Sequence, residues 1–156
     1  MNLNIPYLET DNKLLNDAYR IAAGDIVGNI VYYQNGLLTE EKPCMIAGLD
    51  YNTPWTRDTA INIWNALSIL SPEVSKNTLL AVLEEEEGSI YIGGQYWDSI
   101  IWMIGAREYC RFHKDDNFYR LAFEAGRNSV HRLEEDEFDE EDGLFRGPAV
   151  YGDGIA

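Results

Sequence analysis

Residues 51–64 read Tyr-Asn-Thr-Pro-Trp-Thr-Arg-Asp-Thr-Ala-Ile-Asn-Ile-Trp. Pro54 keeps the residue before it extended, and Thr56 or Asp58 is suited to cap a helix that follows. From residue 60 onward the apolar side chains fall on more than one face of that helix, which is typical of a buried helix. Ionised groups beside a buried element are costly unless they are paired or used. Arg57 and Asp58 therefore mark either a functional site or a pair that only caps the helix.

The same pattern recurs twice along the chain. Residues 95–99, Gln-Tyr-Trp-Asp-Ser, precede the apolar run 100–104, and residues 151–154, Tyr-Gly-Asp-Gly, precede the last two residues. The acids Asp58, Asp98 and Asp153 are spaced by about one helical hairpin each, as in helical repeats. This spacing favours inner helices of a ring whose N-termini surround one pocket.

The remaining periodicity predicts an all-α fold of antiparallel helical hairpins. We expect a first helix over about 11–34, a loop over 36–54, a helix over 56–70 that closes before Pro72, and an outer helix over 73–85. The acidic run 84–87 is expected to be a solvated helix end, followed by a short extended piece over 89–94. Helices over about 98–113 and 115–133 complete the pattern.

Composition excludes several classes of partner and cofactor. The 156-residue chain has a formal net charge of −15, which repels nucleic acid and disfavours anionic membranes. The sequence shows no signal-peptide pattern and no apolar run of membrane-spanning length, so we expect a soluble protein that is cytoplasmic, or periplasmic or secreted with its signal removed. The two cysteines, Cys44 and Cys110, are expected to be buried thiols, and no Cys/His grouping has zinc spacing. We therefore expect neither a metal nor a cofactor.

Two of the motifs resemble segments of the six-hairpin, (α/α)6-toroid glycosidases. Residues 55–60, Trp-Thr-Arg-Asp-Thr-Ala, are similar to the Trp-Thr-Arg-Asp-Ser-Ala segment of glucoamylases. Residues 96–99, Tyr-Trp-Asp-Ser, are similar to a segment of trehalases and to Trp-Asp segments of processing α-glucosidases. The resemblance implies that the whole chain, residues 1–156, is the N-terminal part of one toroidal catalytic domain, truncated near the start of its sixth helix.

The resemblance also implies roles for particular residues. Arg57 and Asp58 would grip hydroxyls of the terminal sugar, and Asp98 would line the same pocket. Asp153 is the candidate general acid, although glucoamylases have Glu in a different surrounding sequence, and the catalytic base would lie beyond Ala156. Four aromatic residues are expected to contact the sugar with their ring faces: Trp55, Tyr96, Trp97 and Tyr151. The loop 142–148 is expected to present Arg146 as a further substrate-binding cation.

The function that follows is inverting exo-hydrolysis of an α-linked gluco- or manno-oligosaccharide by a longer protein, with the fragment itself inactive. Inversion requires two carboxyl groups about 6.5–9.5 Å apart. The alternative is a non-catalytic helical-hairpin protein for binding or assembly, in which the acids are only caps. A missing C-terminal half, or a second copy of the chain, is expected to cover the apolar faces that two and a half hairpins leave exposed.

Overall fold

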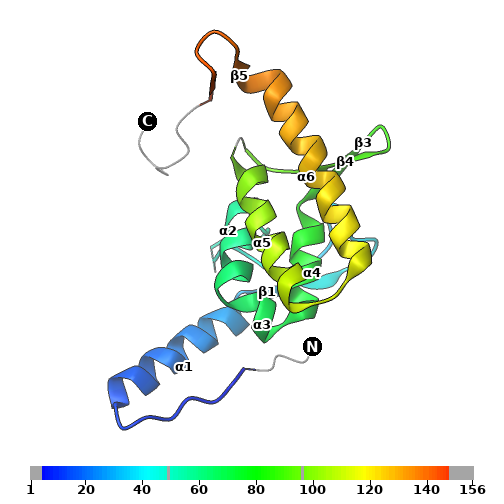
Figure 1. Ribbon diagram of the computed structural model, residues 1–156. Coiled ribbons are helices and arrows are strands. Elements are labelled where there is room, and N and C mark those ends of the chain that lie inside the picture. Colours follow the sequence, from blue (N-terminus) through cyan, green and yellow to red (C-terminus); the bar gives the residue numbers. More distant parts are fainter. Residues whose placement is uncertain (1–4, 49, 96, 148–156) are drawn as a thin grey trace.

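The computed structural model describes residues 5–48, 50–95 and 97–147 (Figure 1). Its helices are α1 (Lys13–Gly28), α2 (Thr56–Asn62), the π-helix η1 (Ile63–Leu67), α3 (Ser68–Leu70), α4 (Pro72–Ala81), α5 (Asp98–Phe112) and α6 (Asp116–Glu137). Its strands are β1 (Ile30–Tyr33), β2 (Lys42–Met45), β3 (Leu83–Glu86), β4 (Ser89–Ile92), β5 (Phe138–Asp139) and β6 (Leu144–Phe145).

The fold is mixed α and β, so the prediction of an all-α class built from antiparallel helical hairpins is wrong. Within the described ranges, six short strands form three two-stranded antiparallel sheets. The first helix ends at Gly28, before the predicted end near residue 34, because the apolar and aromatic residues 30–33 pair with residues 42–45 of the predicted loop. Such β-branched and aromatic residues suit strands.

The acidic run also belongs to a hairpin and not to a helix end. Helix α4 stops at Ala81, and strands β3 and β4 pair with Glu86 opposite Ser89. The two residues between them, Glu87 and Gly88, both have positive φ angles, 51° and 81°. Tight hairpin turns of this handedness match the twist of the strands they join. The predicted extended piece after residue 89 is confirmed as β4.

Several helix boundaries are confirmed. Residues 56–70 form one continuous helical run, α2–η1–α3, and Pro72 occupies the first turn of α4 behind the Ser71 cap. The Asn12 side chain accepts hydrogen bonds from two backbone N–H groups of α1, and Asp115 accepts one at the start of α6. The N-cap residue of α2 is Trp55 and not the predicted Thr56 or Asp58, and the Trp55 side chain makes no capping hydrogen bond.

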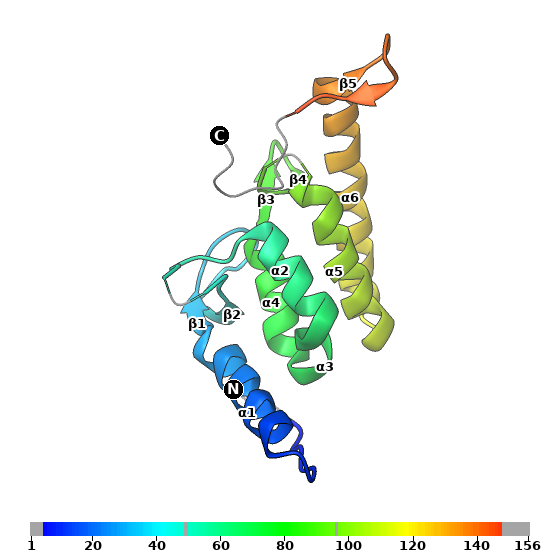
Figure 2. The same ribbon diagram turned by 90° about the vertical axis from the view of Figure 1, so that its left-hand side faces the viewer.

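The core lies between the helical run 56–70, α4, α5 and α6. Its fully buried large side chains include Trp102, whose indole N–H donates to the Leu79 carbonyl at 3.3 Å. Helices α2 and α5 lie side by side (Figures 1 and 2) and come close together at Gly105. A Cβ atom at Gly105 would lie 2.7 Å from the Cα of Ala60. This close approach brings the N-termini of the two helices to the same end of the molecule.

Helix α1 contributes little to this core. It projects away from the other helices in both views (Figures 1 and 2), and none of its residues is buried. Leu14 and Ile21 are 79% and 65% exposed. The apolar stripe of α1 is thus open to solvent in the structure.

Candidate functional site

The first turns of α2 and α5 are joined by an ion pair between two residues of the predicted site. Arg57 Nε donates to Asp98 Oδ1 at 3.1 Å across 41 positions of sequence. The other carboxylate oxygen of Asp98 accepts the backbone N–H of Gln95 at 3.0 Å. Asp98 is only 3% exposed. Both oxygens of this buried carboxylate accept a hydrogen bond, as the burial of a charge requires.

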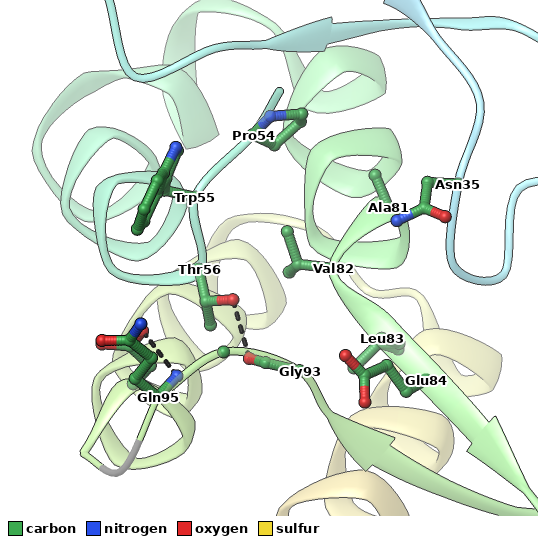
Figure 3. A pocket seen from close by; sticks show the side chains of 12 residues that line it. Asn35, Pro54, Trp55, Thr56, Ala81, Val82, Leu83, Glu84, Gly93 and Gln95 are labelled. Atoms are coloured by element: carbon green, nitrogen blue, oxygen red, sulfur yellow. Dashed lines mark hydrogen bonds between the residues drawn. The ribbon is translucent and has the colours of Figure 1, made fainter. Parts of the chain in front are cut away.

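A glycine loop holds the two helix starts together. The Thr56 hydroxyl donates to the Gly93 carbonyl at 2.7 Å (Figure 3). Gly94 has a φ of +117°. A Cβ atom there would lie 2.9 Å from both Asp98 Oδ2 and Thr56 Oγ1. Only glycine meets both the backbone and the space requirement at this position.

A cavity of about 280 Å³ opens beside this junction (Figure 3). Trp55 stands at its edge, 43% exposed, with its ring edge-on to Tyr51 at 6.0 Å between centroids. The cavity thus combines an aromatic face with carboxylate and amide groups. Its described lining consists of Asn35, Pro54, Trp55, Thr56, Ala81, Val82, Leu83, Glu84, Gly93, Gly94, Gln95 and Asp98.

The other predicted site residues lie in different surroundings. Asp58 lies next to Arg57 in the first turn of α2 and is partly exposed. Trp97 packs edge-on against Phe145 at 5.9 Å, and Arg146 pairs with Asp139 within the β5–β6 hairpin. Of the predicted site residues that the structure describes, Trp55 and Asp98 line the cavity, whereas Arg57, Asp58, Trp97 and Arg146 are not part of its described lining. Tyr96, Tyr151 and Asp153 lie outside the described residues.

Some residues of the cavity were not predicted from the sequence. Glu84 belongs to the acidic run that was assigned to a solvated helix end, yet it lines the cavity from strand β3. Gly93 was predicted only as part of the extended piece 89–94, and Gln95 only as the first residue of the motif 95–99. The signal for Glu84 was Gly88 directly after four acids, which favours a hairpin turn over a helix end.

Other kinds of chemistry have little support in the described part of the chain. No group of three or more His, Cys, Asp or Glu side chains in it is placed to hold a metal ion. Burial raises the pKa of the Cys44 thiol to about 12, and burial also raises the pKa of Cys110. Neither thiol is therefore activated as a nucleophile. None of the described helices combines the length and the apolar character that a membrane span needs.

Comparisons of the chain with models of known protein families, with curated proteins and with solved structures found no match.

Proposed function

We propose that this chain supplies the sugar-contacting part of an inverting glycosidase that acts on α-linked gluco- or manno-oligosaccharides. The observation that carries the proposal is the Arg57–Asp98 ion pair beside a cavity with an aromatic edge. It joins the two motifs, Trp-Thr-Arg-Asp and Tyr-Trp-Asp-Ser, whose resemblance to glycosidase segments implied a shared pocket. The resemblance is supported by this contact, because chance motif matches have no reason to meet in space.

The chemistry of the junction suits a ligand rich in hydroxyl groups. A carboxylate oxygen has two lone pairs and a guanidinium has five N–H donors in a fixed fork, so the pair can exchange hydrogen bonds with vicinal hydroxyls. Trp55 offers its ring to the C–H face of a sugar. We assign hydroxyl binding to Arg57 and Asp98 on this basis, and to Asp58 from the resemblance of its motif alone.

In this proposal Asp153 is the general acid, and no residue of this chain is assigned as the catalytic base. An inverting site needs both carboxyl groups, one on each side of the scissile bond. We therefore expect the 156-residue chain to bind sugars without turnover.

The test is an NMR titration of the chain with monosaccharides and iminosugars. We expect saturable shifts of amides near residues 55–58 and 93–98, weakened by Arg57→Gln and by Asp98→Asn. Arg57→Lys retains the charge and separates loss of the fork geometry from loss of the fold. Arg120→Gln, an exposed substitution on α6, is the matched control. Failure of every sugar to bind a folded sample, or equal binding by all variants, would overturn the proposal.

A second candidate function is binding or assembly without catalysis, and a specific surface favours it. Ile61 and Trp64 on the α2–η1 run, and Ile100 and Ile104 on the neighbouring α5, are each 39–53% exposed. The two helices are in contact, and large exposed apolar patches mark interaction sites on soluble proteins. In this function Arg57 and Asp98 only hold the two helices together, and sugars do not bind.

A further inference from the structure

A second cavity of about 400 Å³ lies next to the cavity beside Trp55, and four residues line both. The second cavity is also lined by residues of α6, Arg132 among them. Its volume lies within the range of roughly 300–1,000 Å³ that is typical of ligand sites, and we call the two neighbouring cavities together the groove. The residues common to both are Glu84, Gly93, Gly94 and Gln95.

Glu84 is the charged group at this meeting point. Its carboxylate lies over Gly93 (Figure 3), where an added Cβ would be 2.5 Å from Glu84 Oε1 and 2.8 Å from the Val82 carbonyl oxygen. The absence of a side chain at Gly93 is thus what makes room for the carboxylate. The backbone of Glu84 is paired with Tyr91 in the β3–β4 hairpin. Its carboxylate has no ion-pair or hydrogen-bond partner among the described residues, and the residue is exposed.

The positive charges near Glu84 are already matched by other acids. Arg57 pairs with Asp98 at 3.1 Å. Arg132 pairs with Glu86 through two nitrogens at 2.7 and 3.2 Å, and it stacks on the Tyr91 ring at 3.5 Å. Glu84 is therefore left as an unmatched negative charge facing whatever fills the groove.

We infer that Glu84 sets the substrate class of the site, so that the groove prefers sugars bearing a protonated amino group and rejects uronates and sugar phosphates. The inference rests on the proposed function and names which sugars it accepts. An ammonium in the groove forms a charge-assisted hydrogen bond with the Glu84 carboxylate. An anionic sugar meets the same carboxylate at short range and is repelled.

The experiment compares methyl glucoside, the methyl glycoside of glucosamine and methyl glucuronide by NMR titration at a pH well below the pKa of an amine. The variants are wild type, Glu84→Gln and Glu85→Gln. Glu85 is the matched control because it neighbours Glu84 on the opposite face of β3 and lines neither cavity. We expect wild type and Glu85→Gln to bind the amino sugar about two- to five-fold more tightly than the neutral one, as suits an exposed ion pair.

In Glu84→Gln this preference should disappear while the neutral sugar binds as before, and added salt should reduce the preference in wild type. Equal preference in wild type and Glu84→Gln, or a glucuronide that binds as tightly as the amino sugar, would overturn the inference. If the neutral sugar binds in an Arg57-dependent way with no effect of Glu84, the proposed function stands and the inference alone fails. If no sugar binds, both fail.

Discussion

Asp115 shows how much one side chain at a helix start contributes to this fold. Its carboxylate accepts the Phe118 backbone N–H at 3.0 Å and pairs with Lys76 Nζ at 2.6 Å, linking the start of α6 to α4. Lys76 and the Phe118 N–H together hold the pKa of Asp115 below its ordinary value of 3.8. The charged form is thus stabilised in the folded state.

Asp115→Ala should lower the free energy of unfolding by about 1–2 kcal/mol at neutral pH, the sum of a lost cap and a partly exposed ion pair. The contribution is fully present above the unfolded-state pKa and is lost as the pH falls through the lower folded-state pKa. Urea unfolding at neutral pH and near pH 3 measures both values. We expect the difference between wild type and Asp115→Ala to shrink at the lower pH.

Asp115→Asn is the control, because it keeps a capping oxygen and removes only the charge. It should lose less than Asp115→Ala at neutral pH. If the difference in unfolding free energy between wild type and Asp115→Ala is the same at both pH values, Lys76 and the Phe118 N–H do not lower the pKa of Asp115.

At the scale of elements, the contact between α2 and α5 requires a residue without a side chain. Gly105→Ala should destabilise the protein by about 1–3 kcal/mol, because the new methyl group meets the Ala60 backbone at 2.7 Å and overpacks the helix contact. Thermal or urea unfolding measures the change. Gly105→Ala should also weaken sugar binding, because separating α2 from α5 moves Arg57 away from Asp98.

Gly24→Ala is the matched helical control. Nothing lies within 4 Å of a Cβ at Gly24 in α1, so the substitution should be neutral or raise helix stability by up to about 1 kcal/mol through propensity. Equal destabilisation by Gly24→Ala and Gly105→Ala would show that the α2–α5 contact is not as close as described.

Helix α1 and helix α5 should differ in how often they open. A 16-residue helix without buried residues has only its own hydrogen bonds and caps to stabilise it, and isolated helices of that length are marginal in water. Hydrogen exchange should therefore be fast in the interior of α1 and slow around the fully buried Trp102 of α5. Equal protection of the two helices would indicate that α1 packs against something in solution.

At the scale of the whole molecule, the apolar side chains on α2–η1 and α5 compete with a strong like-charge repulsion between copies. The net charge of −15 opposes association at low salt, whereas Ile61, Trp64, Ile100 and Ile104 favour it. If this face is the binding surface of the second candidate function, mass measurement by light scattering should show association that increases with salt and protein concentration.

Trp64→Gln should then weaken association by about tenfold or more, as expected for an aromatic residue at the centre of an interface. Tyr7→Gln is the control, because Tyr7 is 82% exposed but lies outside this face. A monomer at every salt concentration, together with Arg57-dependent sugar binding, would favour the glycosidase proposal over the assembly function.

Local sequence was sufficient for the elements whose signals lie within a few residues. Periodicity and proline chemistry were enough to predict the helical run 56–70, the helix start at Pro72 and the extended segment after residue 89. Five of the described strands, β1, β2, β3, β5 and β6, were missed because runs of two to four residues have no periodicity that separates strand from helix. Each of these segments is a strand because it pairs with the other strand of its hairpin, and that pairing cannot be recognised within the segment itself.

The candidate site likewise has a part that local sequence predicted and a part that only the folded structure shows. Arg57 and Asp98 were recognised from their local motifs, because an aromatic residue and an acid before an apolar helix form a local pattern. Three features of the site depend on contacts between segments up to 41 residues apart. Arg57 touches Asp98, Gly94 makes room for Asp98 and Thr56, and Glu84 lines the cavity that Asp98 also lines. Helix periods and caps are short-range properties of the chain, whereas cavities form only where packed segments meet, and for this reason the groove was visible only in the folded structure.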